Sequence, residues 1–317
     1  MSRRAALGRL GAVGLAAFLG SATAPAATAQ TASPRPPLKV VASFSVLADM
    51  AREVAGDLAE VSTLAGANAD AHSFQPSPQD IQRVAQADLL LVNGLGFEPW
   101  LDRLTASAPP RGRVVLASRG IEERRLGPIV DPHAWLSPVQ GRLYLNNIEA
   151  ALLQALGARE APPEALQRLR QRADGARSRL AALDREIRAA LQALPPESRR
   201  VVTTHGAFGY FGRDYGLLIT PLVAGAGEAE ASAGQLARVI RQIRAQRAVA
   251  LFAENTLDVR LLQRVSDETG VAIGGTLYGD ALSASDGPAP SYLGLVAHNA
   301  RTITGALVRL HALEPAR

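Results

Sequence analysis

Short apolar runs rich in β-branched residues alternate along this chain with segments whose apolar positions recur every three to four residues. The first pattern predicts buried strands and the second predicts helices with one apolar face. Their alternation favours parallel sheets with right-handed crossover connections. The predicted strands are 38–43, 58–64, 88–92, 113–117, 200–204, 217–222, 248–253 and 271–276. The predicted helices are 45–55, 79–87, 99–106, 139–156, 164–194, 207–215, 232–245, 257–269 and 292–313.

The segment 164–194 differs from the other predicted helices in its length. It contains no proline, a single glycine (Gly175), and apolar residues at helical spacing from Leu166 to Leu191. At 1.5 Å per residue, a helix of this span is roughly 45 Å long. A coiled-coil arm is one interpretation. Because strand–helix units resume directly after it, we interpret it as a rigid connection between two lobes.

The predicted fold class is therefore α/β, with two lobes that each contain a mostly parallel sheet flanked by helices. We expect an N-terminal lobe over 30–160, a long linking helix over 161–196 and a C-terminal lobe over 197–317. In open α/β sheets, ligands bind outside the carboxyl ends of the strands. Two of the candidate metal ligands discussed below come from each lobe, so we expect the metal site in the cleft between the lobes.

Residues 1–29 have the pattern of a cleaved export signal. Arg3, Arg4 and Arg9 precede a short apolar run over 10–19, and Ala-Thr-Ala at 27–29 is a small-residue cleavage site. The apolar run is too short to span a membrane. The paired arginines also resemble a twin-arginine signal, which exports a folded chain, and an ordinary secretory signal is the alternative.

Composition further limits the possible protein classes and the cellular compartment. Without the three arginines of the signal, the 34 basic residues fall to 31 against 29 acidic ones, a net charge of +2. That balance, with no basic stripe, argues against a nucleic-acid-binding protein. The chain has no cysteine, which excludes disulfides, thiolate metal sites and a lipid-anchored cysteine after the signal. We therefore expect a soluble protein of a bacterial periplasm.

Three of the five histidines stand where an α/β protein places ligand-binding residues. His72 is in the loop after the second predicted strand, His133 is in the proline-bounded loop 131–138, and His205 ends a strand. Asp280 lies just past another strand. Three imidazoles and one carboxylate make a closed tetrahedral site suited to Zn²⁺. Alternatively, each histidine is a hydrogen-bonded structural residue and Asp280 is a turn residue.

Other polar residues are weaker candidates. His298, on the last helix, is interpreted as a packing or surface residue, and His311, near the terminus, as solvated. Asp131 can orient the ring of His133 or cap a turn. Glu254, at a strand end, can support a ligand or act as a catalytic base.

Three aromatic residues can shield such a site from water: Phe74, Trp100 and Trp135. Core packing is the ordinary role for each of them.

Five segments of the chain carry a family resemblance: 70–78 (DAHSFQPSP), 93–101 (NGLGFEPWL), 131–138 (DPHAWLSP), 203–210 and 277–283 (LYGDALS). They resemble, in order along the mature chain, the zinc and manganese substrate-binding proteins of bacterial ABC importers. That class has two α/β lobes joined by one long helix. The resemblance implies that His72, His133, His205 and Asp280 are the metal ligands. It also implies a role as carrier and not as enzyme.

The resemblance bears on metal and partners as well. In this family, a Glu at the position of His205 goes with manganese, and a His there goes with zinc more often. The stretch 118–130 has no histidine, so the His-rich capture loop of many zinc-type members is not expected in that form. The implied partners are a membrane permease with its cytoplasmic ATPase. A periplasmic metallochaperone is a further candidate, and the role implies a monomer.

We therefore expect a periplasmic protein that captures Zn(II) as cargo and delivers it to an ABC importer. Three neutral nitrogens favour zinc over manganese, and Mn(II) cargo is the alternative. Four protein ligands fill the site, which suits carriage. From another class, a secreted zinc hydrolase would use three ligands, a bound water and Glu254 as base, but no His-Glu-x-x-His motif is present. A binder of organic solutes or metal chelates is a third interpretation.

Overall fold

The computed structural model describes residues 36–223 and 233–313. The predicted export signal (1–29) and the predicted first residue of the helix 232–245 lie outside the described residues. Within the described ranges, no helix combines the length and the apolarity needed to cross a membrane.

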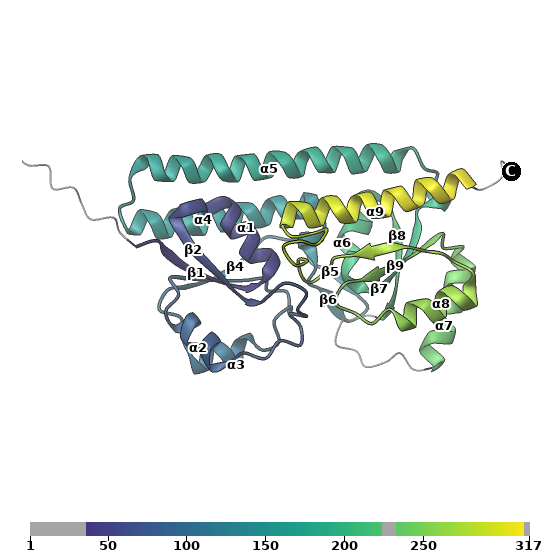
Figure 1. Cartoon of the computed structure of the whole chain (residues 1–317), viewed down its shortest axis with the longest axis horizontal. Coiled ribbons are helices and arrows are strands. Elements are labelled where there is room, and N and C mark those ends of the chain that lie inside the picture. The colour runs from purple at the N-terminus through teal and green to yellow at the C-terminus, as the bar shows by residue number, and fades with distance from the viewer. Residues whose placement is uncertain (1–35, 224–232, 314–317) are drawn as a thin grey trace, which may run out of the picture. The chain divides into compact units, whose positions relative to one another are not determined.

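Two four-stranded sheets carry the fold, and every pairing in them is parallel (Figure 1). The first sheet has the order β2-β1-β3-β4, with strands β1 (Leu38–Phe44), β2 (Ala59–Ala65), β3 (Leu89–Val92) and β4 (Arg113–Leu116). The second has the order β10-β9-β7-β8, with strands β7 (Arg200–His205), β8 (Leu218–Val223), β9 (Ala250–Glu254) and β10 (Ile273–Leu277). The predicted fold class is confirmed.

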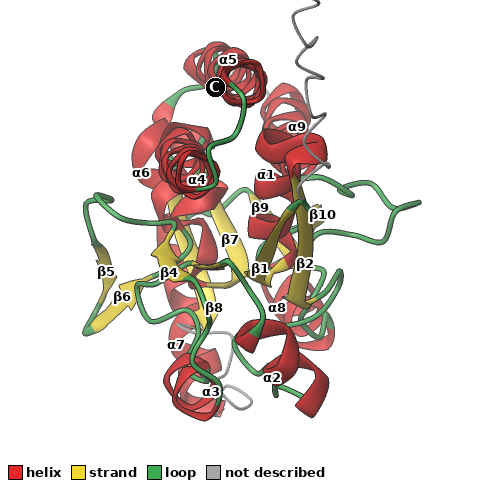
Figure 2. Ribbon diagram, turned by 90° about the vertical axis from the view of Figure 1, so that its left-hand side faces the viewer, coloured by secondary structure: helices red, strands yellow, loops and turns green. Residues whose placement is uncertain are grey.

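Helices flank both sheets. Those of the first half are α1 (Ser45–Ala55), α2 (Pro78–Ala85), α3 (Leu101–Ser107) and α4 (Pro138–Ala158). The long helix is α5 (Pro163–Gln192). Those of the second half are α6 (Gly209–Tyr215), α7 (Ala233–Gln246), α8 (Arg260–Thr269) and α9 (Tyr292–Leu313). Figure 2 shows α1, α4, α5 and α9 on one side of the strands, and α2, α3, α7 and α8 on the other.

The apolar interior is divided into layers, because successive side chains of each strand point to alternate faces of the sheet. In β1, Val40 and Ala42 belong to the cluster under α1, α4 and α5, whereas Val41 packs with Trp100 on the opposite face. Because successive side chains of a strand point to opposite faces, a fully apolar run fits a sheet covered on both sides. The larger cluster includes residues of both sheets, so one apolar layer runs continuously beneath α4, α5 and α9.

The long helix α5 buries a single stripe. Leu169, Leu180 and Ile187 are almost fully buried, and the stripe packs on α4, α1 and α9. A helix docked on neighbours from both halves of the chain is stiffer than a free linker. The predicted lobe boundaries, at 160 and 197, remain predictions.

Each predicted strand and helix is present, with described ends shifted by three residues at most. The largest shift is at α8, predicted from 257. This helix begins at Arg260, where the Asp258 carboxylate accepts the Arg260 backbone N–H at 2.8 Å. This carboxylate satisfies one of the unpaired N–H groups of the first turn, which favours a helix start at Arg260.

An antiparallel hairpin was not predicted. It spans residues 124–131 and consists of β5 (Arg124–Leu126) and β6 (Ile129–Asp131), turning at Gly127 with a φ of +60°. Its strands are too short and too polar for an alternating pattern to reveal them. Contacts with residues distant in the sequence hold this hairpin in place, next to the site described below.

Candidate metal centre

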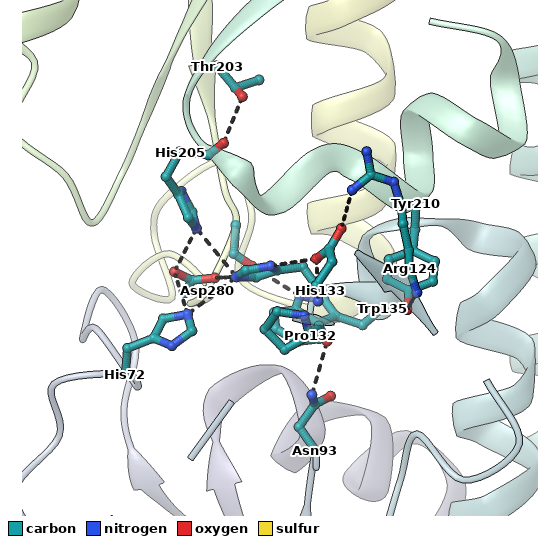
Figure 3. Close-up of polar contacts among 12 residues, drawn as sticks. His72, Asn93, Arg124, Pro132, His133, Trp135, Thr203, His205, Tyr210 and Asp280 are labelled. Atoms are coloured by element: carbon teal, nitrogen blue, oxygen red, sulfur yellow. Dashed lines mark hydrogen bonds and ion pairs between the residues drawn. The ribbon is translucent and has the colours of Figure 1, made fainter. Parts of the chain in front are cut away.

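The four residues predicted as ligands converge on one point (Figure 3). His72 comes from the loop between β2 and α2, and His133 follows β6 after one proline. His205 is the last residue of β7, and Asp280 lies in the loop after β10. One nitrogen or oxygen atom of each lies within 4.8 Å of those of the other three. The structure therefore brings together the whole set predicted from sequence.

The ring nitrogen Nε2 of His133 is central to the cluster. It lies 3.3 Å from His72 Nε2, 3.4 Å from His205 Nε2 and 3.3 Å from Asp280 Oδ1. Asp280 Oδ2 lies 3.4 Å from His205 Nε2 and 3.8 Å from His72 Nε2. Three nitrogens and a carboxylate thus surround a space of atomic size.

The donor set fits a divalent cation. Both carboxylate oxygens of Asp280 are buried and make no hydrogen bond of acceptable geometry with the described residues. A buried carboxylate left this way is costly unless a cation satisfies it. Imidazole nitrogens beside it are ligands that Zn²⁺ and related transition metals accept. Only His72 has an appreciably exposed side chain, at 18%, so solvent reaches the cluster from its side.

The charges of the cluster explain the direction of each pKa shift. Burial alone raises the pKa of Asp280, but the imidazoles of His205 and His133 hold it well below its usual range. Burial alone lowers the pKa of His133, but the nearby carboxylates of Asp131 and Asp280 raise that pKa to about 10. Burial lowers the pKa of His72. The carboxylates of Asp131 and Asp280 thus favour the protonated form of His133.

Two carboxylates behind the rings orient them. Asp131 Oδ1 lies 2.9 Å from His133 Nδ1 and also accepts the His133 backbone N–H at 3.0 Å. Asp131 therefore fulfils both roles considered for it, ring orientation and turn capping. Glu254 Oε2 lies 2.7 Å from His205 Nδ1, and its Oε1 accepts the His205 backbone N–H at 2.9 Å. Such contacts leave Nε2 of each ring directed at the centre.

Glu254 therefore supports a predicted ligand. Both of its oxygens face His205, so neither is directed at a water bound in the centre. The interpretation of Glu254 as a catalytic base has no geometric basis here.

Aromatic side chains line one side of the cluster. Of the three considered as a shield, Trp135 contacts His133, with ring centroids 5.3 Å apart, and is fully buried. Phe74 and Trp100 instead pack on each other at 5.1 Å in the core. Phe97 was not predicted; its ring meets His72 edge-on at 4.5 Å. It lies within the segment 93–101, which carried the family resemblance.

The remaining histidines lie outside the cluster. His298 donates a hydrogen bond of 2.9 Å to the Thr276 carbonyl and meets the ring of Tyr278 edge-on, as expected of a packing residue. His311 is exposed, as predicted, but it also lies 3.1 Å from Ser198 Oγ. Arg124 and Tyr210 meet behind Asp131. Tyr210 was named only as part of the segment 203–210 that carries the family resemblance. Arg124 was not predicted, because the short hairpin has no recognisable sequence pattern.

Comparison with known proteins places this geometry in a family. The family model described as "Zinc-uptake complex component A periplasmic" matches residues 40–306. The iron-binding protein YfeA of Yersinia pestis is 34% identical over 269 residues, 84% of this chain and 85% of that protein. The manganese-binding lipoprotein MntA of Halalkalibacterium halodurans is 30% identical over 272 residues, 85% and 88% of the two chains. The solved structure of the periplasmic zinc-binding protein TroA from Treponema pallidum matches with a TM-score of 0.78 and 28% identity, covering 86% of this chain and 99% of its own.

The metals named for these three proteins differ, but their role is shared. Members of the family are solute-binding components of metal ABC transporters, not enzymes, and they work with a membrane permease and an ATPase. The matched region contains all four residues of the cluster and both sheets except the first two residues of β1. This chain therefore belongs to the family of zinc-uptake component A, the periplasmic metal-binding proteins of ABC transporters.

Proposed function

We propose that this protein captures Zn(II) outside the cytoplasm at His72, His133, His205 and Asp280 and delivers it to the permease of its transporter. The buried carboxylate of Asp280, with no hydrogen bond of its own and three imidazole nitrogens around it, is the observation that carries the proposal. A cation in that space would satisfy all four groups at once.

The choice of zinc rests on the donor set. Three nitrogens and one carboxylate match the tetrahedral coordination that Zn²⁺ prefers, whereas Mn²⁺ binds such ligands more weakly and favours oxygen. TroA is a zinc-binding protein, which agrees with this choice. YfeA and MntA are named for iron and manganese, so the relatives alone do not select the metal. Manganese of the same transporter class is the competing cargo.

Delivery needs a site that holds metal firmly and can still release it. With four protein groups available, no coordination position is reserved for a reactive water, in contrast to a catalytic zinc site. The apolar layer continuous beneath α4, α5 and α9 supports a linking helix that limits hinge motion between the lobes. Loading and release would then involve ordering of the loops more than wide closure. A large decrease in the radius of gyration on zinc binding, measured by X-ray scattering, would contradict this part.

The cellular location, the oligomeric state and a loading partner follow from the same role. We propose that residues 1–29 are a cleaved export signal, that the mature protein acts as a periplasmic monomer, and that a periplasmic metallochaperone can be its loading partner. The N-terminus of the mature protein, determined by mass spectrometry after expression in a bacterium, tests the cleavage.

The decisive experiment is metal content and competitive affinity of the mature protein, with His205→Ala beside the wild type. We expect one zinc per chain, bound in preference to manganese, and an affinity at least about 100-fold lower in His205→Ala, beyond the loss typical of supporting residues. His298→Ala, which removes a histidine outside the cluster, is the matched control and should bind as the wild type does. A preference for manganese would change the cargo and keep the transport role. Binding indifferent to His205 would overturn the proposed site.

A further inference from the structure

The β5–β6 hairpin places a cation directly behind the ring of His133. Arg124 and Asp131 are opposite each other in its antiparallel register. Arg124 Nη1 lies 3.1 Å from Asp131 Oδ2, while Asp131 Oδ1 faces His133 Nδ1 at 2.9 Å. One carboxylate thus joins a guanidinium on one side to a predicted metal ligand on the other (Figure 3).

The hairpin is also seated on the segment that carries His205. The backbone N–H of Arg124 donates to the hydroxyl of Tyr210 at 2.9 Å. Tyr210 belongs to α6, which follows β7 and His205 after only one short turn, residues 206–208. The contact therefore connects the segments that carry two predicted ligands, His133 and His205, by a route that does not pass through the metal.

The hairpin can pack this closely on α6 because residue 209 is a glycine. A Cβ at Gly209 would lie 2.1 Å from Arg124 Nη1 and 2.5 Å from Asp131 Oδ2, far inside van der Waals contact. The backbone of Gly209 has ordinary helical angles, φ −63° and ψ −42°, which any residue adopts. Space, and not conformation, therefore requires glycine at the first position of α6.

The environment makes Arg124 difficult to replace. The side chain of Asp131 is 1% exposed, and among the described residues its ion-pair partners are Arg124 and His133. Without the guanidinium, a buried carboxylate would depend on His133 alone, which is costly and disturbs the ring it is meant to orient. A guanidinium also presents several donors in a fixed plane, which a lysine does not.

We propose, resting on the proposed function, that Arg124 is a positioning residue of the metal centre. It holds Asp131 against His133, seats the hairpin on Gly209 and Tyr210, and thereby slows release of the metal. The hairpin is accordingly a clamp whose opening frees His133 from the site.

The test is the rate at which zinc leaves the loaded, full-length mature protein when excess EDTA is added, followed by stopped flow at fixed pH. Arg124→Ala should release zinc about 10- to 100-fold faster than the wild type, the range typical of residues that support metal ligands. Gly209→Ala, which forces Arg124 away, should act in the same direction. Arg124→Lys should release zinc at a rate between those of the wild type and Arg124→Ala, because lysine keeps the positive charge but lacks the several donors that a guanidinium holds in one plane.

Arg125→Ala is the matched control. Arg125 is on the same hairpin, but its exposed side chain contacts Glu123 and the Pro128 carbonyl on the opposite face. Its loss should leave the release rate within about 2-fold of the wild type, which is the range of a surface substitution away from such features. A purely structural role for Arg124 would lower the unfolding midpoint and leave the release rate, measured well below that midpoint, unchanged.

The outcomes distinguish the proposed role of Arg124 from the proposed zinc-carrier function. Equal release rates in Arg124→Ala and Arg125→Ala would contradict a role of the hairpin in slowing metal release. Zinc bound by the wild type would still support the carrier function. A wild type that binds no zinc would overturn the proposed function itself. If Arg124→Ala does not fold, Tyr210→Phe removes only the hydroxyl that seats the hairpin. Faster release in that variant supports the clamp, and an unchanged rate contradicts it.

Discussion

The indole N–H of Trp135 donates a hydrogen bond of 3.1 Å to the carbonyl of Gly279, 144 residues further along the chain. Trp135 is two residues from His133, and Gly279 immediately precedes Asp280. This bond therefore joins the loop of one predicted ligand to the loop of another. The hydroxyl of Tyr292 adds a second link, because it donates to the Trp135 carbonyl at 2.8 Å.

This position makes Trp135 a natural reporter of metal binding. The chain has two tryptophans, and Trp135 lies beside His133, whereas Trp100 packs on Phe74 in the core of the first half. Zinc bound at His133 would change the charge next to the Trp135 ring. We expect zinc to change the intrinsic fluorescence, with the change lost in Trp135→Phe and kept in Trp100→Phe. A response that disappears in Trp100→Phe would show that the assignment is wrong.

Asp280→Ala distinguishes the carrier from a zinc hydrolase. In the carrier, Asp280 is the one anionic group at the centre, and its loss should weaken zinc binding by more than about 100-fold, beyond the effect of supporting residues. In a hydrolase with three histidine ligands, the metal would stay bound. Competition with a chromophoric chelator measures the affinity, and Asp286→Ala, in the exposed loop before α9, is the control. Retention of tight binding in Asp280→Ala would contradict the four-residue site.

Glu254→Gln tests the support of His205. The amide keeps the shape and can still accept the His205 backbone N–H, but it lacks the charge that faces Nδ1 at 2.7 Å. We expect zinc affinity to fall about 10- to 100-fold. Glu268→Gln, at the exposed end of α8, should leave affinity unchanged in the same titration. Equal zinc affinities in the two variants would show that Glu254 does not support zinc binding.

Zinc binding should release protons, and apparent affinity should rise with pH. Burial alone lowers the pKa of His133, but Asp131 and Asp280 raise it to about 10, so at pH 7 the metal-free protein carries a proton that zinc must displace. The pKa of His205 is also raised, by Glu254 and Asp280 against the effect of burial. Calorimetric titrations between about pH 6 and 8.5, in buffers of different ionisation enthalpy, count the released protons. No net release at pH 7 would contradict the charge state assigned to His133.

The stability of the metal-free protein should change with pH in the opposite direction. The folded pKa of His133, about 10, lies above its ordinary value of 6.5. Its pairing with the two aspartates therefore contributes fully below pH 6.5 and is lost as the pH rises through the folded pKa. Denaturant titrations in the presence of EDTA should show this loss above pH 7. The variant His133→Ala should lack that component.

The long helix should contribute substantially to stability. Leu180 of α5 is fully buried in the layer shared by both halves, so Leu180→Ala leaves a cavity and should lower the free energy of unfolding by about 2–5 kcal/mol. Arg185→Ala, an exposed position on the same helix, should change it by less than about 0.5 kcal/mol. Urea unfolding of both variants gives the comparison. Similar values would mean that the α5 stripe is not an important part of the core.

Much of the fold was predictable from the chain alone, because its signals are local. The β-branched runs of β1 and β7, and the apolar stripe of α5, follow from side-chain periodicity that does not depend on partners. The four clustered residues were also found in sequence, since His205 and Asp280 stand at the carboxyl ends of strands and the segments around His72 and His133 resemble a known family.

Tertiary structure alone decided how those residues are supported. Asp131 and Arg124 are close because of a hairpin of three-residue strands, too short to show a periodic pattern. Glu254 faces His205 because β9 and β7 are neighbours in the sheet, and Trp135 reaches Gly279 across two loops that no local pattern connects. The ligand types were therefore determined by sequence, whereas their orientation, charge state and access depend on packing between distant segments, where burial and neighbouring charges set each pKa.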